Sequence, residues 1–120
     1  MRFKRSTQVA EALKREASDI IANHLKDPRL GFITVTGADM ADDLRYARIY
    51  ISILGEEEAR KKSLAGLESA KGFVRRELGQ RLRLKFTPEI DFRLDESVAT
   101  GDRIDRLLHQ ISDEKRDGPG

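Results

Sequence analysis

The sequence predicts one α+β domain in which helices cover one face of a three-stranded sheet. Apolar residues recur at three- and four-residue steps near the start and in the middle of the chain, which is typical of amphipathic helices. Two other segments, 46–54 and 89–95, alternate between apolar and polar residues, which is typical of strands buried on one face. At 120 residues, the chain has room for one compact domain. The expected order is helix, strand, strand, helix, helix, strand and a short C-terminal helix.

The first helix is expected from Ser6 to about Leu25. Ser6 or Thr7 can cap its N-terminus, and Asp27-Pro28 stops it because the residue before a proline is disfavoured in the α region. Its apolar residues form one stripe, which consists of Val9, Ala10, Leu13, Ala17, Ile20, Ile21 and Leu25. This stripe predicts the face that packs on the sheet.

Three strands are expected. β-branched residues dominate 32–36, and the short polar segment 37–45 joins this strand to an antiparallel neighbour at 46–54. In the second strand, the alternate residues that point to the core are Ala47, Ile49, Ile51 and Ile53. The third strand covers 89–95, and its inward residues are Ile90, Phe92 and Leu94.

A long helical region is expected from the three glutamates at 56–58 to about residue 84. A glycine inside a helix costs about 1 kcal/mol relative to alanine, and Lys71 falls where the apolar stripe needs a core residue. We therefore expect two helices that meet at Ala70-Lys71-Gly72. Ser69 precedes this junction.

The end of the chain is expected to contribute one more element. An amphipathic turn or helix through Ile104, Leu107, Leu108 and Ile111 completes a domain of residues 1–111. Residues 112–120 contain no apolar side chain, so we expect a disordered tail.

The composition excludes several classes of protein. Cysteine is absent, which excludes disulfides, thiolate zinc sites and a cysteine nucleophile. No apolar run approaches the roughly 20 residues of a membrane-spanning helix, so we expect a soluble, cytoplasmic protein without membrane contact. The two histidines, His24 and His109, belong to no paired ligand motif. We predict no catalytic residue, no metal and no cofactor.

The charges are unevenly distributed along the chain. The net charge is only +2, but residues 71–85 hold six bases against one acid, Glu77. The rest of the chain has 17 bases and 20 acids. A basic segment on a mildly acidic body predicts a polyanionic partner.

The candidate RNA-binding residues are mostly in this segment. Arg76, Gln80 and Arg83 follow helical steps on the solvent side, and arginine binds phosphate through two parallel hydrogen bonds. Helix-start amides at the interhelical segment 69–72 are a second anion-binding feature. Near Tyr46 and Tyr50 on the second strand, a stacking platform is less favoured than two half-buried sheet residues. The full set of candidates is Lys71, Arg75, Arg76, Gln80, Arg81, Arg83, Lys85, Arg2, Lys4, Arg5 and Arg45.

The central strand-helix-helix-strand unit resembles a KH domain, which binds single-stranded nucleic acid with a GXXG loop. Here Ser69-Ala70-Lys71-Gly72 stands between the helices, an A-x-G kink with one glycine. With this kink, the chain from about Val9 to Leu108 resembles the ribosome-binding factor A family. The matching stretches are 25–31 (LKDPRLG), 43–47 (DLRYA), 72–79 (GFVRRELG), 82–84 (LRL), 87–89 (TPE) and 95–97 (DES).

The resemblance implies a KH-like type II fold of order α-β-β-α-kink-α-β and no catalytic activity. It implies binding to 16S rRNA in the free, immature 30S subunit, with a role in late maturation, in 16S rRNA processing and in cold adaptation. It also implies release by a ribosome-associated GTPase. We expect a monomer.

Two other functions are weighed against RNA binding. The basic helix of a protein-interaction module would dock on an acidic protein, or the charges would form an ordinary solvated helix face. A metal-dependent nuclease would use Asp39, Asp42 and Asp43 as metal ligands, although a solvated loop is favoured for these three.

Overall fold

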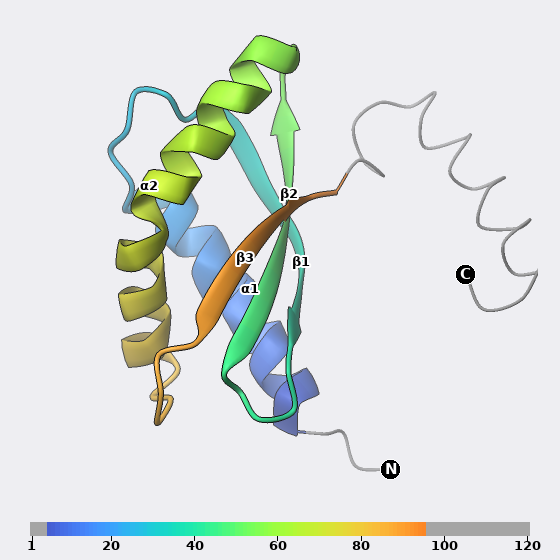
Figure 1. The fold of residues 1–120 in the computed structure, drawn as a ribbon, viewed down its shortest axis with the longest axis vertical. Coiled ribbons are helices and arrows are strands. Elements are labelled where there is room, and N and C mark those ends of the chain that lie inside the picture. Colours follow the sequence, from blue (N-terminus) through green and yellow to red (C-terminus); the bar gives the residue numbers. More distant parts are fainter. Residues whose placement is uncertain (1–4, 96–120) are drawn as a thin grey trace, which may run out of the picture.

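The computed structural model describes residues 5–95, a range that contains two helices and one three-stranded sheet. The elements in chain order are α1 (Arg5–Asn23), β1 (Phe32–Met40), β2 (Tyr46–Leu54), α2 (Glu57–Arg81) and β3 (Glu89–Leu94). Figure 1 shows α1 crossing behind the sheet and α2 running beside it. The predicted α+β class is confirmed. The expected C-terminal helix and tail lie outside the described residues, as do Arg2 and Lys4.

The strands lie in the order β1-β2-β3, and β2 is antiparallel to β1 but parallel to β3. A short loop is enough for the antiparallel pair, whereas the parallel pair needs a crossover, which α2 provides. Phe32 pairs with Leu54 at one end of the sheet, and Tyr46 pairs with Glu89 at the other. The β1–β2 loop and the α2–β3 loop therefore meet at the same end of the sheet. Glu89 N–H donates to the carbonyl oxygen of Arg45 there, at 2.8 Å.

The bounds of β2 agree with the prediction, but β1 is longer than predicted. It continues past residue 36 to Met40, because a register shift between Val35 and Gly37 lets the pairing with β2 resume after Thr36. The polar residue Asp39 belongs to the strand, so polarity alone wrongly marked this stretch as a loop. The connection that remains is 41–45.

The core lies between the sheet and the two helices. The alternation in β2 buries Ala47, Ile49, Ile51 and Ile53, as predicted. Leu94 was predicted to point inward, but it is 37% exposed because it is the last residue of an edge strand. The helices contribute Leu13, Ala17, Ile20, Ile21, Leu67, Val74 and Leu78 to this core. Neither α1 nor α2 has the length and apolar content that crossing a membrane requires.

α2 is one helix of 25 residues, so the prediction of two helices interrupted at Ala70-Lys71-Gly72 is wrong. Figure 1 shows instead that a continuous helix changes direction midway. The helix continues because Leu67, Val74 and Leu78 keep the buried stripe intact, while Lys71 lies at its margin.

Two glycines of α2 permit close packing and do not break the helix. A Cβ at Gly66 would lie 2.8 Å from Leu30 Cδ2, and one at Gly79 would lie 3.3 Å from Thr87 Oγ1. Their missing side chains allow the segment before β1 and the segment before β3 to approach the helix. At Gly72 the nearest atom outside the helix backbone is Arg76 Nη1, at 3.5 Å.

The start of α1 also differs from the prediction. The helix begins at Arg5, so Ser6 is not its cap but a buried helical residue. Ser6 Oγ donates to Asp42 Oδ1 at 3.0 Å, which fixes the first turn of α1 to the β1–β2 loop. This contact brings the N-terminal end of the described chain to the end of the sheet where the two loops meet.

Candidate nucleic-acid interface

The candidate RNA-binding residues fall into two groups according to their surroundings. Residues 71–81 lie in the second half of α2, and 82–88 form the α2–β3 loop. One group of basic side chains is paired with acids of the protein itself. The other group is exposed and has no ion pair within residues 5–95.

Arg81 belongs to the paired group and connects α2 to α1. Its Nη1 lies 2.7 Å from Asp19 Oδ2 and 3.2 Å from Glu16 Oε1, and its Nε lies 3.5 Å from Glu77 Oε1. The hydrogen bond from Arg81 is the main reason why the pKa of Asp19 lies below its ordinary value. Three carboxylates of the domain thus compensate the positive charge of Arg81.

Arg75 and Lys71 are also paired within the domain. Arg75 Nε donates to the carbonyl oxygen of Pro88 at 2.9 Å, and its Nη2 lies 3.1 Å from Glu89 Oε1. Arg75 therefore fixes the start of β3 against α2. Lys71 Nζ lies 2.8 Å from Glu68 Oε2 on the same helix.

Arg76, Gln80 and Arg83 form the exposed group on α2 and its exit, and they follow the predicted three- and four-residue steps. Arg83 has a positive φ of 52°, which is uncommon for a residue with a side chain. Leu84 N–H donates to Gly79 O at 3.0 Å, and Arg83 N–H donates to Gln80 O at 3.2 Å. This pair of bonds is the Schellman ending of a helix, and Arg83 stands at the position that glycine usually takes.

The remaining described candidates, Arg5, Arg45 and Lys85, meet at what we call the loop corner, which is defined by these three residues together with Arg83 and Phe86. The Arg45 guanidinium lies 4.1 Å from the centroid of the Phe86 ring, and Lys85 Nζ lies 5.5 Å from it. Arg5 comes from the first turn of α1. The fold thus brings together three predicted cations, Arg5, Arg45 and Lys85, that are far apart in sequence.

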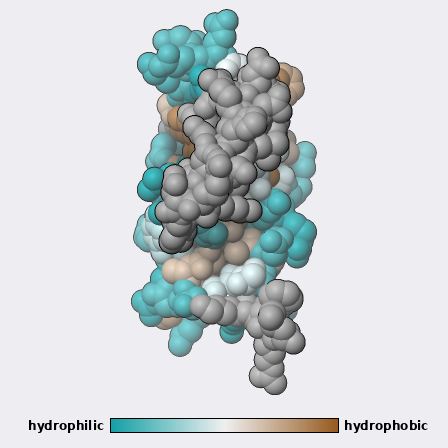
Figure 2. Space-filling model, turned by 90° about the vertical axis from the view of Figure 1, so that its right-hand side faces the viewer, coloured by the Kyte–Doolittle hydropathy of each residue, from teal (hydrophilic) through white to brown (hydrophobic). Residues whose placement is uncertain are grey.

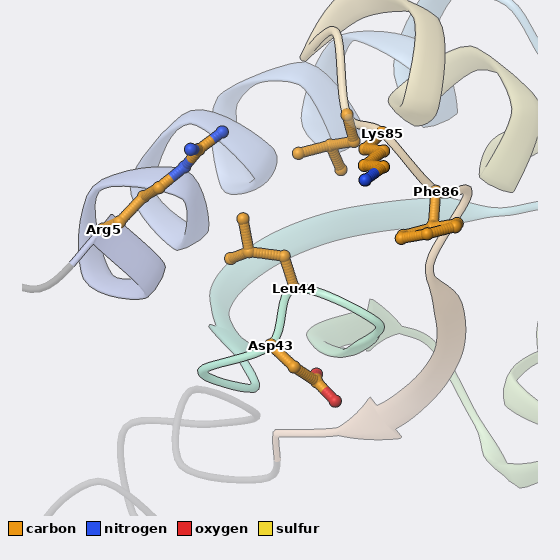
Figure 3. A pocket seen from close by; sticks show the side chains of 6 residues that line it. Arg5, Asp43, Leu44, Lys85 and Phe86 are labelled. Atoms are coloured by element: carbon orange, nitrogen blue, oxygen red, sulfur yellow. The ribbon is translucent and has the colours of Figure 1, made fainter.

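A cavity opens at the loop corner (Figure 3), and its lining consists of Arg5, Asp43, Leu44, Leu84, Lys85 and Phe86. Sequence reasoning missed Leu44, Leu84 and Phe86. The run Leu84-Lys85-Phe86 between a helix and a strand was the available signal, because an apolar pair flanking a lysine is unusual in a solvated turn. Nothing local indicated that Arg45 would reach Phe86.

The open face of the sheet carries a balanced polar network. Tyr46 Oη donates to Asp91 Oδ2 at 3.2 Å, and Tyr50 Oη donates to Asp39 Oδ2 at 3.0 Å. Arg48 stands between these acids in the strand register, and its hydrogen bonds with Tyr50 and Tyr46 raise its pKa. Both tyrosines are therefore engaged within the protein, which favours a structural role over a stacking platform.

The end of the sheet opposite the loop corner is apolar. Phe32 and Leu54 are cross-strand neighbours, 78% and 67% exposed, and they line a shallow groove with Thr34, Thr36 and Ser52. Figure 2, which views the right-hand side of Figure 1, shows a further hydrophobic area in the lower half of the molecule, between hydrophilic areas. Because none of the described residues that line this groove is a cation, it is a different kind of surface from the loop corner.

The candidate metal ligands of a nuclease are not gathered into a site. Asp39 accepts from Tyr50, Asp42 accepts from Ser6, and Asp43 Oδ1 accepts from Arg45 N–H at 3.0 Å. Among the residues that the structure describes, no three histidine, aspartate or glutamate side chains are placed to hold a metal. His24 lies 3.2 Å from Asp19 in the Arg81 cluster, and His109 lies outside the described range.

Both the sequence and the fold of this chain are similar to those of known proteins. A sequence model of the family described as ribosome-binding factor A matches residues 5–108. A crystal structure of ribosome-binding factor A from Thermus thermophilus is similar to this chain, with 26% sequence identity. That match covers 74% of this chain and 94% of the other, with a TM-score of 0.65.

Two further structures are similar. One is a homology model of the Thermus thermophilus factor fitted into a cryo-EM map of a 30S complex, at 25% identity, 80% and 100% coverage and a TM-score of 0.64. The other is a solution NMR structure of a Thermotoga maritima protein described as a candidate ribosome binding factor A. Its sequence is 36% identical to this chain. The match covers 80% of this chain and 84% of the Thermotoga maritima protein, with a TM-score of 0.58.

Proposed function

Because the chain belongs to the ribosome-binding factor A family, we propose that it binds the free small ribosomal subunit through phosphates of 16S rRNA. The observation that carries this proposal is the group of exposed cations that have no acid partner within residues 5–95. The Thermus thermophilus factor has been fitted into a map of its 30S complex, which supports the same partner.

The binding surface consists of the second half of α2 and the loop corner. Arg76 and Arg83 are exposed on α2 and its exit, and Arg45 and Lys85 continue the surface around the α2–β3 loop. Side chains that neutralise phosphates release condensed counterions, so the affinity falls steeply with salt. Arg5 extends this surface, and Arg2 and Lys4 precede it in the chain and remain part of the proposal.

The paired cations have a smaller part in binding. Lys71, Arg75 and Arg81 already contact acids of the protein, and separating such a pair to contact RNA sacrifices the internal interaction. We assign these three residues mainly to holding α2 in place. Gln80 lies between the exposed arginines on the same face and can donate to a phosphate or a ribose hydroxyl.

The protein acts by holding RNA in one conformation, without a covalent step. The finer parts of the proposal are supported by the family resemblance. They are assistance in late 30S maturation and 16S rRNA processing, importance in the cold, and release by a ribosome-associated GTPase. We also propose that the protein acts as a cytoplasmic monomer.

The test is a salt titration of binding to immature 30S subunits and to a 16S rRNA fragment. Binding should weaken as salt increases, with a slope that reports the number of neutralised phosphates. A mature 70S ribosome serves as the control, and we expect weaker binding to it than to the free subunit. Failure to bind RNA at physiological salt, together with capture of an acidic protein, would favour the protein-interaction alternative.

A further inference from the structure

The loop corner concentrates the unusual backbone of the described chain. Leu44 and Arg83, with φ values of 62° and 52°, are the non-glycine residues in the left-handed region between residues 5 and 95. Leu44 lines the cavity of the loop corner, and Arg83 directly precedes Leu84, which also lines it. Backbone conformations of this kind cost free energy and concentrate at functional sites. Two of them beside one cavity single it out from the other hollows of the surface.

The side chains of this corner combine a stacking surface with cations. Phe86 is 45% exposed, and Arg45 covers it as a planar cation at 4.1 Å from the centroid. Figure 3 shows Leu44 rising from the β1–β2 loop toward the space between Arg5 and Lys85. The carboxylate of Asp43 points away from this group, and its Oδ1 accepts from Arg45 N–H.

The cations at this corner are not needed to balance acids of the domain. No ion pair of Arg5, Arg45, Arg83 or Lys85 is formed within residues 5–95. The guanidinium of Arg45 lies over an aromatic ring although Asp43 is only two residues away. An exposed aromatic ring paired with a free guanidinium is the arrangement on which unstacked bases are recognised.

The size of the cavity limits what it can hold. Its volume is about 210 Å³, below the range of roughly 300–1,000 Å³ that is typical of sites for whole small molecules. It therefore fits one part of a larger ligand. A single nucleobase attached to an RNA chain meets this description, because its phosphates can remain outside, among the cations.

We propose that the loop corner binds one unpaired nucleotide, whose base packs against the Phe86–Arg45 stack and whose phosphates lie between Arg5 and Lys85. This inference rests on the proposed function and deepens it. Phosphate contacts on α2 are the same for any RNA backbone, whereas a base can reach Phe86 only when it is neither paired nor stacked in a helix. The corner thus selects unpaired segments of the subunit RNA.

The experiment uses Phe86→Trp, which introduces a single tryptophan into a chain that has none. Its fluorescence is followed while a single-stranded RNA or a duplex of the same sequence is added. The matched control is Phe32→Trp at the opposite end of the sheet, in the groove whose described lining residues include no cation. Affinities of Phe86→Ala and Phe32→Ala for the same RNAs are measured by fluorescence anisotropy, with thermal melts to confirm folding.

We expect single-stranded RNA to quench the tryptophan at position 86, and the duplex to leave it unquenched. The tryptophan at position 32 should not respond to either RNA. Phe86→Ala should lose about tenfold in affinity for the single strand and little for the duplex, because base–aromatic stacking accounts for a loss of that order.

Three outcomes separate this inference from the proposed function. Equal quenching by duplex and single strand, or an unchanged affinity of Phe86→Ala, overturns the nucleotide site while phosphate binding stands. No binding of the unmodified protein to any RNA or to the subunit overturns both proposals. If Phe86→Ala melts early, the quenching of the folded Phe86→Trp variant decides the question by itself.

Discussion

Four arginines in the second half of α2 and the loop that follows it lie within a span of nine residues, but their surroundings differ. Arg75 and Arg81 contact backbone and acids of neighbouring elements, whereas Arg76 and Arg83 face solvent without an ion pair inside residues 5–95. The same residue type therefore fixes the position of the helix on one side and is free for a ligand on the other. A count of basic residues in a segment does not distinguish these two uses.

The largest expected effect is on binding by the exposed pair. Arg76→Glu with Arg83→Glu should weaken binding to immature 30S subunits by about a hundredfold, on the order of tenfold for each reversed phosphate contact. Co-sedimentation at fixed salt measures the loss. The control is Arg15→Glu with Lys62→Glu, which makes the same charge change at exposed sites on α1 and on the first half of α2. Equal losses in both double variants would contradict a localised surface.

The role of the arginines that are paired within the protein is tested by measuring stability. Arg81→Met leaves the carboxylates of Asp19, Glu16 and Glu77 without their common cation. We expect its Tm to fall by several degrees, whereas Arg76→Met should change the free energy of unfolding by no more than about 0.5 kcal/mol, as is usual at exposed sites. Circular dichroism melts measure both. A larger loss in the Arg76 variant would reverse the assignment of these two arginines.

Arg83→Gly should move stability and binding in opposite directions. Glycine tolerates a φ of 52°, so relief of the left-handed conformation should stabilise the fold by about 1 kcal/mol. The same change removes a phosphate contact and should weaken RNA binding by about tenfold. Gln80→Gly is the contrasting variant, because glycine inside α2 should destabilise by about 1 kcal/mol. Denaturant unfolding measures the opposite changes in stability that are expected for the two variants, and fluorescence anisotropy measures their affinity for RNA.

The smallest expected effect is on acid stability. In the folded protein, the hydrogen bond from Arg81 is the main cause that lowers the pKa of Asp19 below 3.8. Ionised Asp19 therefore contributes stability above the unfolded pKa, and this contribution is lost as the pH falls through the lowered folded pKa. Arg81→Met should lose less stability than the unmodified protein as the pH falls below about 3.8, and Arg76→Met should follow the unmodified protein. Denaturant unfolding over an acid pH series would show parallel curves for all three if the Arg81–Asp19 contact were unimportant.

The sequence correctly predicted the elements in which buried apolar residues recur at regular spacing. β2 was placed correctly because Ala47, Ile49, Ile51 and Ile53 alternate without exception. The continuation of β1 was missed because a bulge at Thr36 interrupts that alternation. The unbroken α2 was missed because Lys71 was taken as a break in the apolar stripe, whereas it lies at the margin of that stripe. The glycines were taken as a cost to the helix, but Gly66 and Gly79 allow close packing against neighbours that are not visible in the local pattern.

The sequence located the basic segment, but it did not show which of its side chains are paired within the protein and which are exposed. The local excess of bases pointed to the second half of α2 and its exit, where the exposed cations lie. The acid that pairs with Arg81 most closely, Asp19, lies 62 residues away, so no spacing rule reveals it. The approach of Arg45 to Phe86 likewise depends on the parallel pairing of β2 with β3, which brings two distant loops to one end of the sheet.

The bulge in β1 has a consequence for self-association. In the described part of the chain, β1 is an outer strand, whose unpaired backbone could recruit the strand of another molecule. The shift after Val35 bends and twists this edge, so that a flat strand added there could not keep its ladder beyond Thr36. Thr36 Oγ1 donates to Asp95 Oδ2 at 2.8 Å, which anchors the irregular residue on the open face of the sheet. An irregularity that made the strand hard to recognise in the sequence thus protects the protein from edge-to-edge aggregation.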